Sequence, residues 1–522
     1  MGIDTSQSNY PGGANRLHLR CHNRYDEAPL AAHIWIVLGN HLDITREIEE
    51  TPAGAATLAF FDLDGTIIFG YSIGSVFLER VTSGKLAPQD ALNQFVQLMG
   101  HGVSGDDYSI LLQEAAETLA GVPESEFIEL GESIFRKYLA RAIYPESRAL
   151  IRAHQQRGHT VAILSSATPY QIGPLAAELG IEHVMCNHFE TANGEFTGEV
   201  CEPIVFADGK RVAAEAFAEK HGSDLSKSFF YSDGYEDLPM LQAVAYPRPL
   251  NPDGKLEQEA RLRGWPVRHF SSRGFPGVRE FVRTGLVYGA FFSAALQIVP
   301  TWILNRSRRD AVNLAVTTWG EFGSALAGIE INITGEHYLW EQRPAVFLFN
   351  HQSAIDVLII AKLLRKYFTA IAKQEIARNP LVGPVFRVAD TVFVDRKNQE
   401  KAIDALKPVV KTLQDGLSVA IAPEGTRSNT DQLGAFKKGP FHIAMQAQVP
   451  IVPIVIHNAS DVLPKGGFFI RPSVVHVDVL PPVSTADWTA NSVDDHVSEV
   501  RNSFLKILGQ LNASPAKLKS VK

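Results

Sequence analysis

The chain has 522 residues, 45% hydrophobic and 20% charged, which is the composition of a globular protein and excludes a disordered or collagen-like chain. Its length exceeds that of one hydrophobic core and predicts two to four domains. The net charge of −8 and the lack of a reader motif argue against a nucleic-acid-binding protein. Three cysteines without metal-ligand spacing indicate free thiols in a reducing compartment.

Charge is distributed unevenly along the chain. Residues 1–282 carry 23 basic and 37 acidic residues, a balance of −14, whereas residues 283–522 carry 26 and 20, a balance of +6. The contrast indicates two domains with different partners, although sampling scatter is the simpler alternative. A basic half suits an anionic lipid surface or a phosphorylated substrate.

Short apolar runs in the first half predict buried strands, each followed by polar residues. The runs lie at residues 57–61, 161–164 and 229–231. Helical segments separate them, namely residues 71–142, 173–179 and 211–220. This alternation predicts an α/β fold with a doubly wound parallel sheet. Ligands of such sheets bind at the carboxyl ends of the strands, so polar residues there are candidate site residues.

Two carboxylates follow the first predicted strand, in the sequence Asp-Leu-Asp-Gly-Thr at residues 62–66. One can attack phosphorus and form an aspartyl-phosphate, and the other can serve as acid and then base. Gly65 permits the tight turn that this geometry needs. Later strand ends and helix starts add Ser165 and Lys210 for a phosphate, and Asp233 and Asp237 for a hard cation such as Mg²⁺. Each alone is typical of a solvated loop or a helix cap, but the ordered set favours a site.

Through these motifs, residues 55–275 resemble the haloacid dehalogenase superfamily, in the branch that includes phosphoserine phosphatases. The resemblance implies a Rossmann-like core with a helical cap at about residues 71–142. It implies Asp62 as the nucleophile and Asp64 as the acid and base. Mg²⁺ would be held by Asp62, the Asp64 backbone carbonyl and Asp233, with support from Asp237, and the phosphoryl group by Ser165 and Lys210.

One position departs from that branch. Phosphoserine phosphatases carry a glutamate shortly after the nucleophile that reads the substrate amine, and this chain has Tyr71 near that position. The substrate is therefore expected to be a different phosphomonoester, such as a lipid phosphate.

An apolar stretch separates the two halves. Residues 285–304 contain no charged residue over 20 positions, a length that suffices to cross a bilayer. Gln297 and Pro300 weaken a simple span, and basic residues on both flanks favour a cytoplasmic location for each end. We therefore predict a helical pair in the cytoplasmic leaflet, with a buried core helix as the alternative.

The α/β pattern returns in the second half, with predicted strands at 345–349, 391–394, 418–422 and 451–456 and a helix at 399–414. His351 and Asp356 follow the first of these strands. Histidine is the natural base near neutral pH, and a nearby carboxylate can fix its tautomer. His351 can thus take a proton from a hydroxyl that attacks a thioester. A helix capping box from Ser353 to Asp356 is the structural alternative.

Two further strand ends carry arginines with planar forks suited to phosphate oxygens. Arg396 follows one, and the sequence Glu-Gly-Thr-Arg at Glu424, Gly425, Thr426 and Arg427 follows the other. Residues 449–454 add an apolar wall for an acyl chain. With the His-x₄-Asp block, these features resemble the glycerol-phosphate acyltransferase family, closest to 1-acyl-glycerol-3-phosphate acyltransferases, over residues 285–515.

That second resemblance implies an α/β acyltransferase domain with an N-terminal membrane-associated helical segment. It implies His351 as the base, Asp356 as its partner, and Arg396 with Glu424, Gly425, Thr426 and Arg427 as the phosphate-binding wall. The family usually has glycine at the start of its second block, where this chain reads Ala-Asp-Thr at residues 389–391.

Together the resemblances imply a bifunctional enzyme of phospholipid synthesis at the cytoplasmic face of the cell membrane. The first domain would hydrolyse a phosphomonoester with Mg²⁺ as cofactor. The second would move an acyl group from acyl-CoA or acyl-carrier protein to 1-acyl-sn-glycerol-3-phosphate, a lysophospholipid acceptor, giving phosphatidate. The alternatives are an active acyltransferase with a regulatory first domain, or a non-catalytic lipid-binding scaffold on the membrane.

The predicted boundaries follow from these assignments. They are a poorly ordered extension at 1–55, the phosphatase domain at 56–280, the membrane-associated helices at 283–330, the acyltransferase domain at 331–515 and a frayed basic tail at 516–522.

Overall fold

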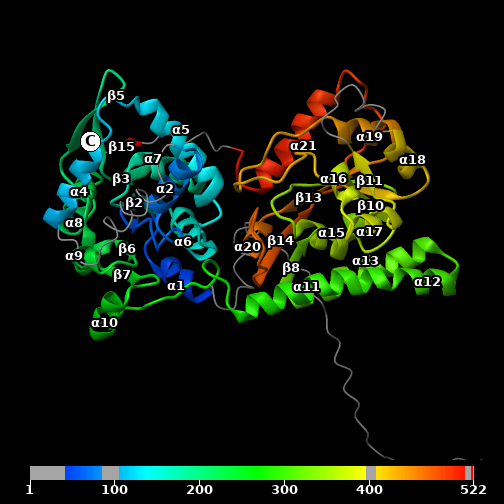
Figure 1. The fold of residues 1–522 in the computed structure, drawn as a ribbon, viewed down its shortest axis with the longest axis horizontal. Coiled ribbons are helices and arrows are strands. Elements are labelled where there is room, and N and C mark those ends of the chain that lie inside the picture. The colour runs from blue at the N-terminus through cyan, green and yellow to red at the C-terminus, as the bar shows by residue number, and fades with distance from the viewer. Residues whose placement is uncertain (1–41, 85–104, 395–406, 512–518, 521–522) are drawn as a thin grey trace, which may run out of the picture.

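The computed structural model describes residues 42–84, 105–394, 407–511 and 519–520. They form two α/β units, each built around its own sheet (Figure 1). The first unit comprises the described residues up to 277, together with residues 519–520. The second unit begins with a long helical segment at residue 278.

The first unit is a six-stranded sheet in which every adjacent pair of strands is parallel. Its order is β15 (Lys519–Ser520), β3 (His183–Met185), β2 (Thr160–Leu164), β1 (Leu58–Phe61), β6 (Phe229–Ser232) and β7 (Tyr246–Pro249). Successive side chains of a strand point to opposite faces. Accordingly Ala59 and Phe61 lie in one hydrophobic core and Leu58 and Phe60 in the other. This accounts for the continuous apolar run of β1.

Helices cover both faces of this sheet, as the sequence predicts. They are α1 (Leu42–Glu50), α6 (Pro145–Gln156), α7 (Pro169–Leu179), α8 (Asp208–Lys220), α9 (Leu238–Ala243) and α10 (Gly254–Arg263). The short turns η3 (Leu225–Lys227) and η4 (Tyr235–Asp237) precede β6 and α9.

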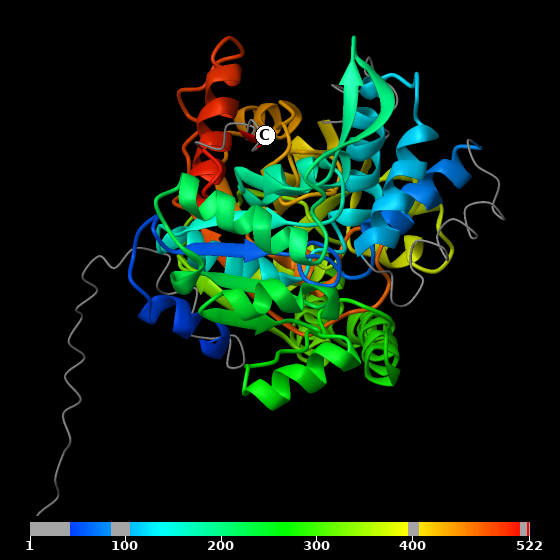
Figure 2. The same cartoon turned by 90° about the vertical axis from the view of Figure 1, so that its left-hand side faces the viewer.

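A helical cap follows β1. Its described elements are α2 (Ser72–Thr82), α4 (Gly105–Glu117), α5 (Glu124–Ile134) and η2 (Phe135–Leu139). The predicted helical character of residues 71–142 is confirmed over these four elements, whereas the described residues 118–123 form a loop. A two-stranded hairpin that the sequence did not suggest, β4 (His188–Ala192) and β5 (Glu195–Cys201), projects beside the cap (Figure 2).

Two predictions about the chain ends were wrong for their described parts. Helix α1 falls within the supposedly poorly ordered residues 1–55, yet Ile48 is buried in the first core. Glu47 on the same helix also forms an ion pair with Arg248. Residues 519–520 of the predicted frayed tail form β15, which pairs with β3. In both places, contacts with distant residues stabilise a segment whose local sequence is weakly structured.

Cys186 is buried and Cys201 is exposed, and both are free thiols. The third cysteine, Cys21, lies outside the described residues.

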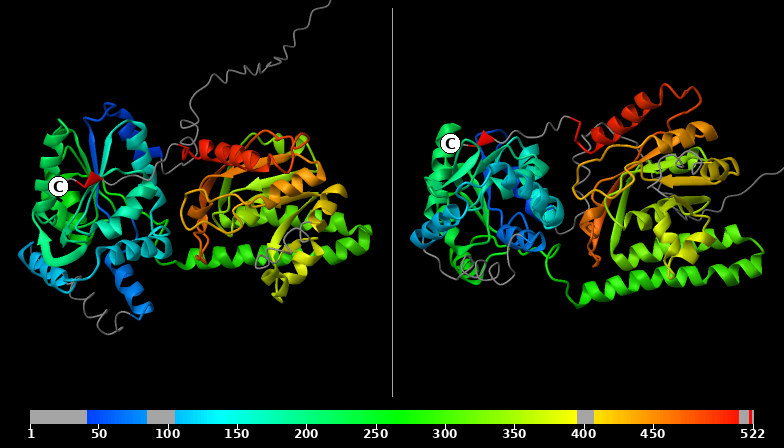
Figure 3. Two further views of the ribbon diagram at one scale, coloured as in Figure 1. Left: turned by 90° about the horizontal axis from the view of Figure 1, so that it is seen from above. Right: turned by 45° about the horizontal axis from the view of Figure 1, so that its top comes forward.

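The second unit starts with the predicted apolar helices, α11 (Val278–Leu296) and α12 (Ile298–Asn305), followed by α13 (Arg308–Ala327). Figure 3 shows α11 and α13 side by side along one edge of this unit. Helix α13 packs closely on α15 (Asp356–Leu364). Gly320 permits this approach, since a Cβ at its position would lie only 2.8 Å from the Lys362 Cα. The stretch Val278–Asn305 is long and apolar enough to cross a membrane, and only 17% of its most apolar window is buried in this protein.

A seven-stranded sheet forms the rest of this unit. Its order is β11 (Val392–Val394), β10 (Phe368–Lys373), β12 (Ser418–Ile421), β9 (Val346–Phe349), β13 (Ile451–Ile456), β14 (Ser473–Val479) and β8 (Ile329–Thr334). One adjacent pair in this sheet departs from the parallel arrangement, since β14 runs antiparallel to β13. The chain reverses between these strands through α20 (Ala459–Val462) rather than by a crossover helix.

The remaining helices flank this sheet, with Phe347 and Phe349 in one core and Val346 and Leu348 in the other. They are α14 (Tyr338–Glu341), α16 (Gln374–Arg378), α17 (Gly383–Val388), α18 (Lys407–Gln414), α19 (Gly439–Ala447) and α21 (Val493–Ile507). The four predicted strands are confirmed within one residue at each end, whereas β8, β10 and β14 were missed. The predicted helix 399–414 is confirmed from Lys407, and its earlier part lies outside the described residues.

Candidate active sites

The first candidate site lies at the carboxyl ends of β1 and β6, which are adjacent in the sheet. The Asp62 backbone N–H donates to the Tyr231 carbonyl at 2.9 Å, so the loop after β1 begins beside the loop after β6. Thr66 Oγ1 then lies 3.4 Å from Asp233 Oδ1. Residues 167 positions apart are thereby brought to one edge of the sheet, as the sequence predicts for a parallel fold.

Lys210 is the cationic centre of this site. Its Nζ donates to Asp62 Oδ1 at 3.0 Å and to Asp237 Oδ2 at 2.8 Å. The Lys210 side chain is only 3% exposed, and a buried cation is stable only when it is paired. Burial lowers the pKa of Lys210, but Asp237 and Asp62 raise it above its ordinary range. The lysine therefore stays charged and draws both carboxylates towards one point.

Asp64 has partners that sequence reasoning missed. Its carboxylate accepts from the backbone N–H of Ser72 at 2.7 Å and from the Ser72 hydroxyl at 3.1 Å. Gln171 in turn donates to that hydroxyl at 3.3 Å. Ser72 is the first residue of α2, the first helix of the cap. A serine at a helix start after the Asp-x-Asp turn is the sequence feature that could have predicted this partner of Asp64. These bonds hold Asp64 in a fixed orientation at the base of the cap.

Burial raises the pKa of several carboxyl groups in this site. The pKa of Asp62 rises to about 7 through burial, opposed by Lys210 and reinforced by Asp237 and Asp64. Burial raises the pKa of Asp64 to about 6, against the hydrogen bonds from Ser72. The pKa of Asp233 is well above its usual range because of burial and the nearby charge of Asp62. Such a cluster of destabilised carboxylates favours a cation between them.

The residues of this site fit a Mg²⁺ ion that takes only a few of its ligands from the protein. Among the described residues, no three side chains of His, Cys, Asp or Glu converge as a metal cluster. A site with two carboxylates and one backbone carbonyl is consistent with that finding, since Mg²⁺ usually keeps several waters and binds substrate phosphate. The second oxygen of Asp237 is buried without a hydrogen-bond partner in the described part of the chain, which leaves it free to hold such a water.

Ser165 directly follows β2, the strand adjacent to β1, and is 2% exposed. Its Oγ accepts from the Ala167 backbone N–H at 3.3 Å, and its own hydrogen is available to a phosphate oxygen. The cap supplies Tyr108, whose hydroxyl donates to the Ser166 carbonyl at 2.8 Å. Tyr71 lies half-exposed at the mouth, where burial and Asp233 raise its pKa.

Gly65 fits this turn because no larger residue can occupy its position. Its φ is +69°, and a Cβ there would lie 1.9 Å from Asp233 Oδ2. We expect Gly65→Ala to lower phosphatase activity at least tenfold, since the left-handed strain of about 1–2 kcal/mol is joined by displacement of Asp233. Gly84→Ala is the matched control, with φ +73° and nothing within 4 Å of its Cβ. Equal losses in the two variants would show that backbone strain alone is responsible.

The second candidate site lies at the carboxyl ends of β9 and β12, which are adjacent in the other sheet. His351 Nδ1 lies 2.7 Å from Asp356 Oδ2. The same oxygen accepts the backbone N–H groups of Gln352 and Ser353, each at 2.9 Å, and Asp356 is fully buried. The carboxylate therefore fixes Nδ1 as the protonated nitrogen and leaves Nε2 as the base. The alternative of a helix capping box from Ser353 to Asp356 is not borne out, because α15 begins at Asp356 with Ile355 as its N-cap and the Ser353 hydroxyl accepts from the Ile355 N–H at 3.1 Å.

Glu424 anchors the two loops of this site to each other. Its Oε1 accepts from the His351 backbone N–H at 2.8 Å and its Oε2 from the Gly434 N–H at 3.0 Å. Burial raises the pKa of Glu424, while these two hydrogen bonds oppose the rise. The carboxylate oxygens thus hold backbone groups, and neither is bound to an arginine among the residues that the structure describes.

Arg427 and its neighbours are positioned by that turn. Gly425 has φ +74°, and its amide donates to the Ala422 carbonyl at 3.1 Å. Ser428 N–H donates to the His351 carbonyl at 2.8 Å, which places the Arg427 loop directly beside the histidine. Thr426 is exposed and Arg427 half-buried. Arg396, the other predicted phosphate ligand, lies outside the described residues.

Comparison with known proteins identifies relatives of each of the two units. The chain matches the family of haloacid dehalogenase-like hydrolases over residues 59–242 and the acyltransferase family over residues 330–457. A "probable phosphatase" of Mycobacterium tuberculosis is 31% identical over 230 residues, 42% of this chain and 79% of that protein. A 1-acyl-sn-glycerol-3-phosphate acyltransferase of Cocos nucifera is 35% identical over 209 residues, 40% of this chain and 67% of that protein.

This chain belongs to both families. The similarity to the acyltransferases is confined to part of each relative. Another such acyltransferase, from Limnanthes alba, is 35% identical over 184 residues, which is 35% of this chain and 65% of that protein. We refer below to the hydrolase-like unit and the acyltransferase unit.

Proposed function

We propose that the chain is a bifunctional enzyme that hydrolyses a phosphomonoester in its hydrolase-like unit and acylates a lysophospholipid in its acyltransferase unit. The observation that supports the first activity is the Lys210 bridge between Asp62 and Asp237. The observation that supports the second is the 2.7 Å contact between His351 Nδ1 and Asp356. The test is a product assay by mass spectrometry with purified protein, lysophosphatidate, acyl-CoA and Mg²⁺, and phosphate release measured separately.

In the phosphatase reaction, an Asp62 oxygen attacks phosphorus and the bond to the leaving oxygen breaks. Asp64 protonates that oxygen. It can donate a proton near neutral pH because burial raises its pKa to about 6. It then takes a proton from the water that hydrolyses the aspartyl-phosphate. Lys210 and Ser165 hold the phosphoryl oxygens. A bound Mg²⁺, held by Asp62, Asp233 and the Asp64 carbonyl, would offset the negative charge that gathers at this point.

The substrate of this unit is proposed to lack the amino acid group of phosphoserine. The mouth of the site presents the half-exposed Tyr71 rather than a carboxylate that would pair with an amine. Phe69 is also exposed and stacks edge-on against Phe275 near that mouth. An aromatic rim suits a substrate with an apolar portion, such as a lipid phosphate. A phosphatase screen in which phosphoserine is clearly preferred would contradict this.

In the acyl transfer, His351 Nε2 removes the proton from the acceptor hydroxyl as its oxygen attacks the thioester carbonyl. The imidazolium, stabilised by Asp356, then returns that proton to the departing thiolate. Arg427, with Arg396 as a second candidate, would hold the acceptor phosphate, because a guanidinium matches phosphate oxygens in pairs. The donor is a thioester of coenzyme A or acyl-carrier protein.

The acyltransferase unit is proposed to rest on the cytoplasmic face of the membrane through α11 and α12. This surface is unusually apolar for a water-exposed helix pair: Phe281, Leu286, Leu296, Val299, Trp302, Ile303 and Leu304 are all exposed. Arg279 and Arg306 lie at its two ends, where they can meet anionic headgroups. An exposed apolar surface of this kind marks an interaction site.

The triple variant Leu296→Ser, Ile303→Ser and Leu304→Ser tests this membrane contact. We expect its partitioning onto vesicles of phosphatidylcholine and phosphatidylglycerol to fall at least about 100-fold, since each buried aliphatic side chain contributes about 1.5–3 kcal/mol. Flotation through a density gradient measures the bound fraction. Leu262→Ser is the matched control, because Leu262 is 76% exposed but lies on α10 of the other unit. Unchanged flotation of the triple variant would place the membrane contact elsewhere.

A further inference from the structure

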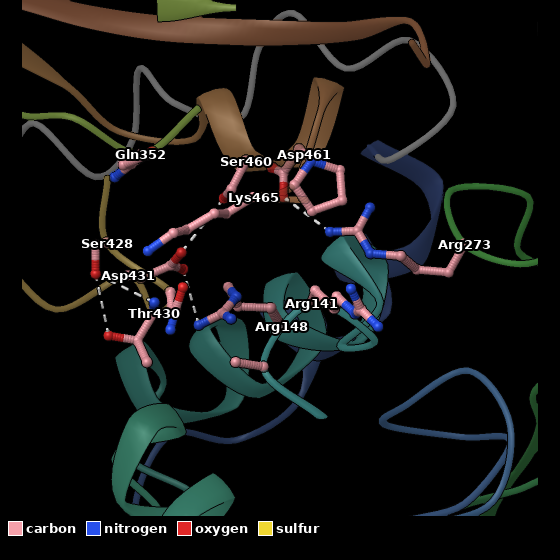
Figure 4. Close-up of a pocket in the computed structure, with 13 residues that line it drawn as sticks. Arg141, Arg148, Arg273, Gln352, Ser428, Thr430, Asp431, Ser460, Asp461 and Lys465 are labelled. Atoms are coloured by element: carbon pink, nitrogen blue, oxygen red, sulfur yellow. Dashed lines mark hydrogen bonds and ion pairs between the residues drawn. The ribbon is translucent and has the colours of Figure 1, made fainter. Parts of the chain in front are cut away.

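A small cleft lies between the two units, next to loops from both candidate sites (Figure 4). Its volume is about 20 Å³, against the roughly 10–15 Å³ that one water molecule needs. It therefore admits a small polar group but not a nucleotide base. The charged residues that line it are Arg141, Arg148 and Arg273 of the hydrolase-like unit, and Asp431, Asp461 and Lys465 of the acyltransferase unit.

The charges of this lining do not balance. Arg148 pairs with Asp431 at 3.0 Å, and Arg273 lies 3.9 Å from Asp461. Arg141 and Lys465 have no carboxylate partner among the residues that the structure describes: Lys465 Nζ donates to the Arg427 carbonyl at 2.6 Å, and the Arg141 guanidinium lies 5.8 Å from the centre of the Tyr138 ring. Two positive charges are thus left over, which matches the charge of about −1.5 to −2 on a phosphomonoester near neutral pH.

A buried donor in the cleft also lacks a partner. The Arg273 side chain is 8% exposed, and its Nε has no hydrogen-bond acceptor within the described residues. A buried guanidinium N–H without an acceptor is costly, and an anion in the cleft would satisfy it. Thr430, whose hydroxyl oxygen lies 3.4 Å from that of Ser428, offers a further donor on the opposite wall, whereas Ser428 Oγ donates to the Gln432 carbonyl at 3.3 Å.

The surroundings of the cleft do not cancel this excess. Burial lowers the pKa of Lys465, and the nearby cations Arg427 and Lys373 lower it further. Glu178, which lies behind Arg148, has its pKa raised to about 7 by burial and by Asp431, so it carries less than a full charge near neutral pH. Arg152 is close enough to these groups that Arg148 lowers its pKa, in addition to its burial.

We propose that this cleft is a phosphate-binding site shared by the two units, in which Arg141 and Lys465 are the direct cationic ligands of a phosphomonoester group. Neither unit completes it alone. The phosphate belongs either to a lipid headgroup or to free inorganic phosphate. Its occupant would contact the loop whose Ser428 N–H holds the His351 carbonyl. It would also contact α6, where Ser147 Oγ donates to the Thr66 carbonyl of the phosphatase loop at 2.5 Å.

The test is the rate at which Lys465 of the full chain is acetylated by an amine-reactive ester, measured by mass spectrometry with EDTA present. The two ligand arms use inorganic phosphate and hexanoyl-lysophosphatidate, with hexanoylglycerol at equal ionic strength as the phosphate-free control. Saturating ligand is expected to slow the acetylation of Lys465 about tenfold. Lys411, whose side chain is 74% exposed, should keep its rate in every arm. The measurement does not depend on catalysis. A protein that showed no enzymatic activity but a protected Lys465 would therefore contradict the proposed function and not the phosphate site.

Each outcome decides the proposal. Protection by both ligands supports a site for the phosphate group itself, and protection by lysophosphatidate alone supports a site for the lipid headgroup. No protection by either overturns the proposal. The exposed Arg141 allows a further check, since Arg141→Gln should abolish protection while Arg261→Gln, a substitution of a 76% exposed arginine on α10, should leave it intact. Full protection in Arg141→Gln would overturn the role of Arg141 as a direct ligand and with it the proposed pair.

Discussion

Replacing His351 by alanine is expected to reduce acyl transfer by about 10³-fold or more, with no effect on phosphate release. The loss removes the proposed general base, whose contribution is typically 10²–10⁴-fold, and leaves Asp356 buried without its partner. Asp356→Asn should also be strongly impaired, because an amide can no longer favour the tautomer that leaves Nε2 free. Initial rates of thioester release with lysophosphatidate measure both variants.

A second histidine provides a demanding control for that experiment. His457 Nε2 lies 2.7 Å from Asp478 Oδ2, the same contact distance as in the proposed catalytic pair. It follows β13 in the same sheet but lies outside the His-x₄-Asp block. We expect His457→Ala to keep acyl transfer within about threefold of the unaltered protein, allowing for a modest structural cost. Equal losses in the two histidine variants would show that the His–Asp contact is structural in both places.

Replacing Asp62 by asparagine is expected to abolish phosphate release, with a loss of about 10⁴-fold or more, as for the removal of other covalent nucleophiles. The change keeps the shape of the side chain and removes a carboxyl group whose burial raises its pKa. The melting temperature should therefore not fall. Phosphate release from a panel of phosphomonoesters with Mg²⁺ gives the activity, and calorimetry gives the stability.

Asp208→Asn is the matched control for the nucleophile. Asp208 lies two residues from Lys210 on the same helix, but its side chain is 61% exposed and pairs with Arg211. Its replacement should leave phosphate release unchanged. If Asp62→Asn and Asp208→Asn both retained full phosphate release, that hydrolysis would not use Asp62 as its nucleophile. Absence of phosphate release from the unaltered protein over the whole panel would instead favour the alternative of a regulatory first unit.

The two single-site variants also test the independence of the units. The proposed function predicts that His351→Ala loses only acyl transfer and that Asp62→Asn loses only phosphate release. A variant that lost both activities while remaining folded would indicate that the reactions depend on each other. The contacts between the Asp431 loop and α6 provide a physical route for such dependence.

Much of the local structure was predictable because apolar runs and polar motifs each lie within short segments of the sequence. The apolar run before Asp62 predicts β1, whose two faces lie in two cores. The order of the motifs predicts which strand ends meet, because parallel strands place their carboxyl ends along one edge. The juxtaposition of Asp62 with Lys210 and that of His351 with Asp356 accordingly agree with what the sequence suggested.

Other features depended on contacts that no local pattern records. Ile48 of α1 is buried only because α6 and the sheet surround it. Glu424 was expected to form part of the phosphate-binding wall, yet its carboxylate binds two backbone N–H groups from different loops. The antiparallel β14 and the hairpin β4–β5 were likewise missed, since their short or mixed patterns fit several arrangements.

By itself, the sequence determined the two α/β units, the order of their polar motifs and the apolar helices between them, because periodicity and turn chemistry act over a few residues. Only the tertiary structure decided how the units meet. The cleft between Arg141 and Lys465 joins side chains 324 positions apart, and its charge balance depends on which carboxylates happen to lie within reach. Coulombic interactions depend on distance in space rather than along the chain, so no reading of the residues in order could have revealed it.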